Sequence, residues 1–320
     1  MTAALGLGPA IVTGGARGIG RAAALALAGA GHPVCVNDTG VDIDGSSPRP
    51  EPAGAVAAEV EAAGGAALPA ALDARTPAAA RRLVAEVEAW AGAPPTVLVH
   101  AGGTLRDAMV HKASDDDWAE VLGSHLFVAI ELTRAMAPAL RQGGHGRIVY
   151  VGGAAGLVGS IGQAAYGVAK AGLFGLTRAV ALEMAGRDVC VNYLAPFAFT
   201  RMTESIPPAT DQLRAYLAAA PLATPADIAP VVVWLCSPAV AGITGQVLGA
   251  RGAAATLWSQ PRPQVEALER RGWDPLRLET NARPLFQPHL TPLESEFDLF
   301  GGPPQPVVRK GTDDREEPIS

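Results

Sequence analysis

Short apolar runs alternate with longer stretches of helical periodicity from about residue 9 to residue 250. The runs contain few polar residues, so each predicts a strand buried on both faces. They lie at 9–13, 33–37, 66–72, 96–100, 147–151, 189–194 and 246–248. The intervening stretches predict helices at 21–30, 52–63, 77–90, 115–140, 166–185 and 225–236. This alternation, with right-handed crossovers, predicts an α/β fold with a doubly wound parallel sheet.

The pattern changes after residue 251. Ten prolines follow residue 260, so regular elements are scarce there, and the chain ends in a charged run. We interpret 1–251 as one domain, 252–300 as an ordered C-terminal extension and 301–320 as a disordered tail. The extension cannot form a core alone, so its large apolar side chains should bury on an existing surface. These are Trp258, Leu268, Trp273, Leu276, Phe286, Leu290, Leu293 and Phe297.

A glycine-rich turn, TGGARGIG, joins the first predicted strand to the first predicted helix. Gly14 permits a tight turn, Gly18 lets the backbone approach a pyrophosphate, and Gly20 lets the helix pack closely on the strand. The helix N-terminus adds N–H groups that favour phosphate. This arrangement is typical of a dinucleotide site in a Rossmann fold. The candidate residues in the turn are Gly14, Arg17, Gly18, Ile19 and Gly20.

Asp38 ends the second predicted strand, about twenty residues after the glycine turn. A carboxylate there accepts hydrogen bonds from the ribose hydroxyls of NAD and repels the 2′-phosphate of NADP. Arg17 would favour NADP, but a carboxylate beside the ribose should dominate. We expect NAD as the cofactor.

Tyr166 and Lys170 lie four residues apart in GQAAYGVAKAG, which places them on one face of a helix. A phenol titrates near pH ~10, and a neighbouring ammonium favours its ionised form. The pair alone could be two surface neighbours. Together with the glycine turn, it predicts an acid–base pair beside a bound nucleotide.

Composition excludes several classes of function. The net charge of −6 and a pI near 5.5 argue against nucleic-acid binding. No apolar run approaches the ~20 residues that cross a bilayer, and the N-terminus has no basic flank typical of a signal peptide. Three widely spaced cysteines in apolar stretches favour buried reduced thiols. We expect a cytoplasmic enzyme with no metal site, no nucleic-acid partner and no membrane partner.

The glycine turn and the Tyr-x-x-x-Lys pair resemble the short-chain dehydrogenase/reductase family over residues 8–251. Within it, the chain is most similar to the (3R)-hydroxyacyl-CoA dehydrogenase group, which includes the dehydrogenase part of the peroxisomal multifunctional enzyme and actinobacterial relatives. The segments that carry this likeness are VCVNDTG, LRDAMV, VNYLAPFAFTRMTE and the region from ITGQVLGARG to LWSQPRP. The resemblance implies an NAD-dependent oxidoreductase that interconverts a hydroxyl and a ketone on a 3-hydroxyacyl-CoA or a related acyl or steroid thioester.

The resemblance also implies roles for residues outside the two motifs. Tyr166 and Lys170 would be catalytic, and His125 would stand where the family has an asparagine that holds a proton-relay water. Further cofactor contacts would come from Asp73 at the adenine, Gly103 in the HAGG turn, and Pro196 and Thr200 at the nicotinamide. The resemblance implies a homodimer or homotetramer that pairs through the helices predicted at 115–140 and 166–185, whose apolar residues include Val121 and Leu173. In the resembling enzymes, the C-terminal extension crosses to the neighbouring subunit and helps to close its substrate cavity.

The departure from the family pattern that bears most on catalysis is at Gly153. The serine that polarises the substrate carbonyl lies thirteen residues before the tyrosine, and here that residue is Gly153. Losing one such donor costs about 10²–10³ in rate. Two interpretations follow: an active dehydrogenase with an altered site, or a catalytically impaired cofactor-binding homologue that supports an active partner subunit. His100, Thr104 and Ser160 are the nearby polar residues that could replace the serine.

Overall fold

The computed structural model describes residues 8–208, 210–300 and 302–308 and contains one eight-stranded sheet. The strand order is β3-β2-β1-β4-β5-β6-β7-β8; β1 to β7 are parallel, and β8 is antiparallel to β7. All seven predicted strands are present. The strands are β1 (Ala10–Thr13), β2 (Val34–Asn37), β3 (Ala67–Ala70), β4 (Val97–His100), β5 (His145–Val151), β6 (Asp188–Phe197), β7 (Val247–Arg251) and β8 (Ala254–Leu257).

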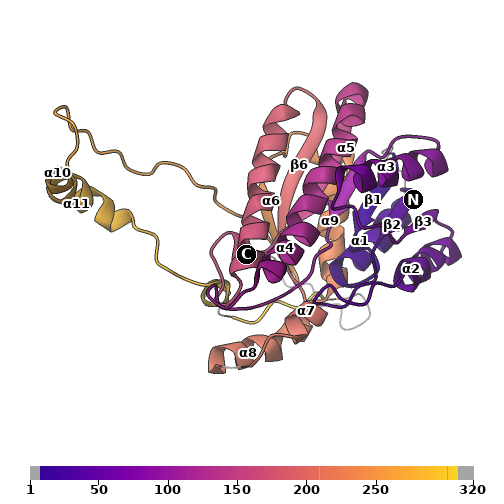
Figure 1. The fold of residues 1–320 in the computed structure, drawn as a ribbon, viewed down its shortest axis with the longest axis horizontal. Coiled ribbons are helices and arrows are strands. Elements are labelled where there is room, and N and C mark those ends of the chain that lie inside the picture. Colours follow the sequence, from indigo (N-terminus) through magenta and orange to yellow (C-terminus); the bar gives the residue numbers. More distant parts are fainter. Residues whose placement is uncertain (1–7, 209, 301, 309–320) are drawn as a thin grey trace.

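Helices cover both faces of the sheet, as Figure 1 shows. One face carries α1 (Gly18–Gly29), α2 (Glu51–Ala62) and α9 (Pro225–Cys236), and the other carries α3 (Pro77–Ala91), α5 (Val128–Gly143) and α6 (Ala164–Glu183). Successive residues of a strand point to opposite faces. Ala10 and Val12 therefore join the first core, whereas Ile11 joins the second. The predicted doubly wound α/β fold is confirmed.

The strand order reverses between β1 and β4, and this position fixes where ligands bind. In the sheet, Thr13 lies between Asn37 of β2 and His100 of β4. All three residues end their strands, so their side chains meet at the carboxyl edge. Open parallel sheets bind ligands in the crevice at this reversal.

The long helix predicted over residues 115–140 is interrupted. The structure has α4 (Asp115–Leu122), a π-helical turn at Gly123–Phe127, and then α5. A π turn adds one residue to the helical repeat and is frequent at functional sites. Here it directs His125 inward, and Gly103 opposite has no side chain because a Cβ there would lie 1.8 Å from the His125 ring. Hydrophobic periodicity alone gives no sign of this one-residue insertion.

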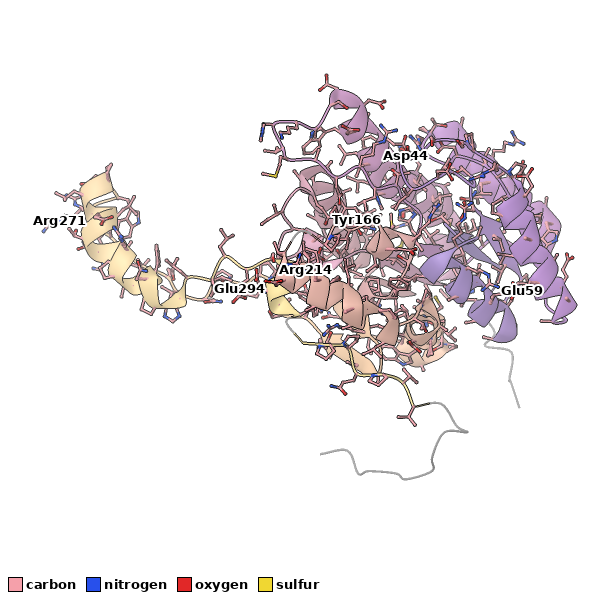
Figure 2. All side chains as sticks on the ribbon, turned by 90° about the horizontal axis from the view of Figure 1, so that it is seen from below. Asp44, Glu59, Tyr166, Arg214, Arg271 and Glu294 are labelled. Atoms are coloured by element: carbon pink, nitrogen blue, oxygen red, sulfur yellow. The ribbon has the colours of Figure 1, made fainter. Side chains whose placement is uncertain are left out.

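The sequence did not predict β8 (Ala254–Leu257). Its small, exposed residues show no alternation, and only the turn at Gly252, with a φ of +56°, marks the hairpin. After β8, the chain leaves the body as an arm that carries α10 (Pro275–Arg277) and α11 (Arg283–Phe286) (Figure 1). Figure 2 shows Arg271 far out on this arm.

The arm returns to the body at α12 (Glu296–Leu299), so the two ends of the extension pack on its own subunit and the middle does not. Leu268, Leu276, Leu290 and Leu293 are all exposed. Residues 302–308 lie against the turn that follows β7, where the Ala253 N–H donates to the Gln305 carbonyl at 2.8 Å. The predicted disordered tail covers residues 301–320, of which 301 and 309–320 lie outside the described residues.

The three cysteines are buried and form no disulfide, as predicted. Burial raises the pKa of Cys35 and of Cys236 to about 12. These thiols therefore stay protonated and act as small apolar core residues.

Candidate active site

A cavity of about 490 Å³ opens at the carboxyl edge of the sheet, at the reversal between β1 and β4. Every residue that the sequence predicted for catalysis or cofactor binding lines this single cavity. They are Gly14, Arg17, Gly18, Ile19, Gly20, Asp38, Asp73, Gly103, His125, Tyr166, Lys170, Pro196 and Thr200. The cavity has a glycine-lined end at α1 and a polar end at α6.

The glycine turn is packed too tightly for side chains. A Cβ on Gly20 would lie 2.1 Å from the Gly14 carbonyl oxygen, and one on Gly14 would lie 2.6 Å from Gly102. Gly18 is different, since a Cβ there would meet nothing closer than Thr200 at 3.4 Å, and its φ is +50°. Its open face is directed at the cavity, as the backbone approach of a pyrophosphate requires. The residues present therefore fit a dinucleotide.

Asp38 connects the glycine turn to the loop after β2. Its carboxylate accepts hydrogen bonds from the Ala16 N–H at 3.0 Å and the Gly40 N–H at 2.7 Å. The Arg17 guanidinium donates to the carbonyls of Val41 at 2.8 Å and Gly40 at 3.3 Å. Arg17 is therefore held against backbone and away from the open centre of the turn.

Asn37 is a cavity residue that sequence reasoning missed. Its amide donates to the carbonyls of Ala70 at 3.1 Å and Leu72 at 2.8 Å, which holds the end of β2 against the segment after β3. Asp73 follows on that segment and pairs with Arg75 at 2.8 Å. A polar residue at the last position of a buried strand was the available signal for Asn37.

Tyr166 and Lys170 lie on the inward face of α6, as predicted. The Lys170 Nζ atom is 5.3 Å from the centre of the Tyr166 ring and donates to the Val151 carbonyl at 2.8 Å. The expected lowering of the Tyr166 pKa is wrong for this structure: desolvation raises it, and Glu296 and neighbouring polar groups add to the rise. Burial also lowers the pKa of Lys170 to about 7. Desolvation outweighs the attraction because both groups lie in the same enclosed space.

His100 and His125 form a hydrogen-bonded chain beneath the cavity. Thr13 Oγ1 lies 2.7 Å from His100 Nδ1, and His100 Nε2 lies 2.6 Å from the His125 carbonyl. His125 Nε2 lies 2.8 Å from the Thr104 carbonyl. A ring nitrogen facing a carbonyl must carry hydrogen, so His125 Nδ1 is an acceptor, and it has no hydrogen-bond partner among the described residues. Burial and the Lys170 charge lower the pKa of His100 to about 3 and that of His125 well below its usual value, so both rings are neutral.

Gly152 and Gly153 are held by a residue that the sequence did not single out, Tyr193 of β6. Its hydroxyl donates to the Gly153 carbonyl at 2.7 Å and accepts from the Gly153 N–H at 2.8 Å. A Cβ on Gly152 would lie 1.9 Å from the Tyr193 ring, whereas one on Gly153 would lie 3.4 Å from the Tyr166 hydroxyl. Tyr193 thus requires glycine at 152, but position 153 has room for a small side chain.

Aromatic rings from three distant segments pack together at one wall of the cavity. Phe197 at the end of β6 and Tyr216 on α8 (Asp211–Ala219) line the cavity, and Phe297 on α12 packs against Tyr216. The Tyr216 ring is 5.0 Å from Phe197 and 4.8 Å from Phe297, centre to centre. Glu296, next to Phe297, also lines the cavity. Sequence analysis missed both the wall and Glu296, because no local motif marks them.

The comparisons with known proteins agree with this geometry. The family model for enoyl-(acyl carrier protein) reductase matches residues 14–252. The chain is 37% identical to hydroxyacyl-CoA dehydrogenase ChsB1 of Mycobacterium tuberculosis over 286 residues, 87% of this chain and 88% of that protein. It is 35% identical to a mouse (3R)-3-hydroxyacyl-CoA dehydrogenase over 241 residues, 74% of this chain and 92% of the relative.

A solved structure resembles the whole fold. The crystal structure of a short-chain dehydrogenase from Mycobacterium avium has a TM-score of 0.73 and 31% sequence identity, and the match covers 88% of this chain and 95% of that one. Fold, cavity, motifs and relatives therefore agree, and the chain belongs to the short-chain dehydrogenase/reductase family of oxidoreductases.

Proposed function

We propose that this protein interconverts a hydroxyl and a ketone on a 3-hydroxyacyl-CoA or a related acyl thioester, with NAD(H) as its nucleotide. One observation carries the proposal: the glycine turn and the Tyr166–Lys170 pair line the two ends of one cavity. Relatives that cover most of the chain are named hydroxyacyl-CoA dehydrogenases and support the substrate class. The family uses nicotinamide dinucleotides, and the choice of NAD is part of our proposal.

Asp38 supports NAD over NADP. The glycine turn and the N-terminus of α1 would hold the pyrophosphate, and the Asp38 carboxylate would accept from the ribose hydroxyls. Arg17, the cation that would favour NADP, already donates to the Val41 and Gly40 carbonyls. When bound, the reduced nicotinamide supplies a hydride.

Tyr166 is our proposed acid for the substrate oxygen, and Lys170 positions it. The Tyr166 hydroxyl keeps its proton in this structure because its pKa is raised. A protonated phenol can donate to a ketone oxygen, which is the role needed in the reducing direction. The Lys170 Nζ atom, fixed by the Val151 carbonyl, limits the positions that the ring can take.

The comparisons do not support the alternative, a catalytically impaired partner subunit. Gly153 leaves Tyr166, Lys170 and the nucleotide end of the cavity in place. The aromatic side chains of Phe197 and Tyr216, which line the cavity, suit a fatty or alicyclic group better than a sugar, because their surface is mostly apolar.

We also propose that the protein is a homodimer or homotetramer. The arm exposes Trp273 and Leu276, and a large apolar side chain in water favours burial on a partner. Of the helix residues that the sequence suggested for pairing, Val121 and Leu173 are buried in their own subunit. The exposed apolar residues on these helices are Phe127, Val168 and Leu182.

Light scattering tests the oligomer. We expect a mass that is a multiple of 32.6 kDa, and partial dissociation in the double variant Trp273→Glu/Leu276→Glu. A wild-type monomer would contradict the proposal.

Cytoplasmic location remains a proposal. Among the described residues, no single helix is long and apolar enough to cross a bilayer. The segments Leu213–Leu222 and Pro225–Cys236 reach that length together, but they meet at a bend of 68°.

The function is tested with purified protein, a series of 3-oxoacyl-CoA substrates and NADH, measured by the loss of NADH absorbance. We expect turnover by wild type and a loss of about 10²–10⁴-fold in Tyr166→Phe, the range for removal of a general acid. NADH affinity, measured by Trp fluorescence, should be unchanged in that variant. Absence of turnover with every chain length and with both NADH and NADPH would refute the proposed function.

A further inference from the structure

The reacting end of the cavity lacks the serine hydroxyl of the family pattern, and the backbone at that position does not replace it. Gly153 stands at the position of the serine in the family pattern, and both its N–H and its carbonyl are bonded to the Tyr193 hydroxyl. The Gly153 N–H is therefore committed and cannot donate to a substrate. A second donor beside Tyr166 must come from another segment.

The other polar residues near Gly153 are also committed. His100 lies between Thr13 and the His125 carbonyl, and Thr104 Oγ1 lies 2.8 Å from Ser124 Oγ. The free nitrogen of His125 is an acceptor. None of these three side chains offers a hydrogen to a ketone oxygen, and Ser160, the remaining candidate from the sequence, does not line the cavity.

Glu296 enters the same cavity from the C-terminal extension. Its backbone N–H donates to the Gly159 carbonyl at 3.2 Å, and the next residue, Phe297, packs on Tyr216. Its carboxyl lies against the Ser160 hydroxyl and the backbone of Ala155, two residues after Gly153. Helix α12 thus fixes a carboxyl group beside the segment that lacks the serine.

The Glu296 carboxyl has no cation to hold it ionised. Among the described residues, no lysine, arginine or histidine pairs with it within 4.0 Å. Burial raises its pKa to about 7 and outweighs the lowering by Ser160 and Ala155, and the nearby Asp107 adds a smaller rise. A carboxylic acid kept neutral by burial can donate a hydrogen bond at neutral pH.

We propose that the Glu296 carboxyl donates to the substrate oxygen the hydrogen bond that Gly153 cannot donate. The inference rests on the proposed function and assigns this role to a residue of the extension. The Glu296 carboxyl donates a hydrogen bond but does not transfer its proton. Tyr166 remains the group that protonates the substrate oxygen. Two donors, a phenol and a carboxylic acid, then face one ketone oxygen.

The surrounding charges make this role dependent on pH. Asp107 faces Glu296 from the loop before α4, where Gln163 donates to it at 2.9 Å. The tyrosines that sense the Glu296 charge, Tyr166, Tyr193 and Tyr216, have raised pKa values and stay protonated. Lys170 of α6, in the same cavity, loses its proton near the same pH. An ionised Glu296 would no longer donate and would repel a substrate oxygen.

A double-mutant cycle tests the proposal, with kcat/KM for 3-oxoacyl-CoA reduction as the measurement. We expect Glu296→Ala to lose about 10²-fold, the usual cost of one such donor. Gly153→Ser should recover at least tenfold in the Glu296→Ala background, since a Cβ at 153 has room beside the Tyr166 hydroxyl. If the effects of the two substitutions on kcat/KM are independent, so that Gly153→Ser recovers nothing in the Glu296→Ala background, the proposal is overturned. Glu294→Ala, an exposed residue labelled in Figure 2, is the matched control and should behave as wild type.

The variant Glu296→Gln keeps a hydrogen-bond donor at this position but removes the group that titrates. An amide donates at every pH. The kcat/KM of this variant should therefore stay within about fivefold of the wild-type value at pH 6, and it should fall less than the wild-type value between pH 6 and pH 8. A pH profile identical to wild type would show that Glu296 does not act on the substrate, even if Glu296→Ala disturbs folding of α12.

Binding of 3-oxoacyl-CoA to the NADH complex, measured by calorimetry at pH 6 and pH 8, keeps this test separate from the proposed function. If wild type does not turn over, the proposed function fails. Binding that weakens with pH in wild type and not in Glu296→Gln would still support the role of Glu296. Equal binding by wild type, Glu296→Ala and Glu294→Ala would refute it.

Discussion

The two ends of the cavity are built by different means. At the nucleotide end, consecutive residues of one turn supply backbone atoms, and packing leaves no room for a Cβ at Gly14 or Gly20. At the reacting end, the groups are side chains from α6, β6 and α12 that lie far apart in sequence. The nucleotide end therefore depends on close steric packing, whereas the reacting end depends on the charge and protonation of buried side chains.

This difference determines how each end responds to change. The glycine turn has no room for an added atom at Gly14 or Gly20, and the backbone groups it offers to a nucleotide do not titrate. The reacting end has room at position 153 but depends on buried groups whose pKa values have moved toward neutrality, to about 7 for both Lys170 and Glu296. We therefore expect the nucleotide end to be sensitive to added side-chain volume and the reacting end to be sensitive to pH.

The largest effect should come from Gly20→Ala. The added Cβ would lie 2.1 Å from a backbone oxygen, which cannot move away as a side chain would. We expect a destabilisation above about 3 kcal/mol and at least a 10²-fold loss of NADH affinity. Gly29→Ala in the same helix, α1, is the control, because a Cβ there meets nothing within 4 Å. It should stabilise by up to about 1 kcal/mol, as Ala does in a helix. If the two variants have similar free energies of unfolding in urea and similar affinities for NADH, close packing does not exclude a side chain at Gly20.

Lys170→Met should change how stability depends on pH. The pKa of Lys170 falls from 10.5 in the unfolded chain to about 7 in the folded one. Between these values the unfolded chain binds more protons, so the contribution of Lys170 to stability rises with pH. From pH 7.5 to 9.5, wild type should gain up to about 2.7 kcal/mol relative to Lys170→Met, at 1.36 kcal/mol per unit.

The exposed Lys112 provides the control for this measurement. Lys112→Met should follow wild type across the same range of pH in chemical unfolding. A constant difference between wild type and Lys170→Met would show that Lys170 is not desolvated as the structure indicates.

Gly152→Ala and Gly153→Ala form a matched pair at the reacting end. The first places a Cβ 1.9 Å from the buried Tyr193 ring, and the second meets only van der Waals contacts. We expect a cost of about 1–3 kcal/mol for Gly152→Ala, the range for overpacking, and below about 1 kcal/mol for Gly153→Ala. Thermal unfolding should separate them by several degrees. Equal melting temperatures would mean that Tyr193 does not constrain this turn.

The smallest effect should be on nucleotide choice. Asp38→Ala removes the carboxylate that would meet the ribose, so the preference for NADH over NADPH should shrink about tenfold, or 1.4 kcal/mol. Asp42→Ala, in the same loop and paired with Arg49 at 2.6 Å, is the control and should keep the wild-type preference. Fluorescence titration with both nucleotides measures it, and tighter NADPH binding by wild type would contradict the assignment of NAD.

The same contrast explains what could be predicted from the sequence. Strands buried on both faces and a contiguous turn leave local patterns, so the seven parallel strands and the glycine turn were predicted. Tyr193 and Glu296 were missed because their roles depend on contacts across 40 residues or more. The direction of the Tyr166 pKa was wrong because residue spacing shows charge proximity but not burial. The π turn at His125 is a one-residue insertion that helical periodicity does not show.

The return of α12 to the cavity has a consequence for synthesis of the chain. The contact between Glu296 and Gly159 joins residues 137 positions apart, and the sheet between them is complete at residue 257. Domains begin to fold while the C-terminus is still on the ribosome. The nucleotide end can therefore form first, and the carboxyl group of Glu296 arrives only when translation is nearly finished. A chain released early would keep its glycine turn and its tyrosine but lack this second acid.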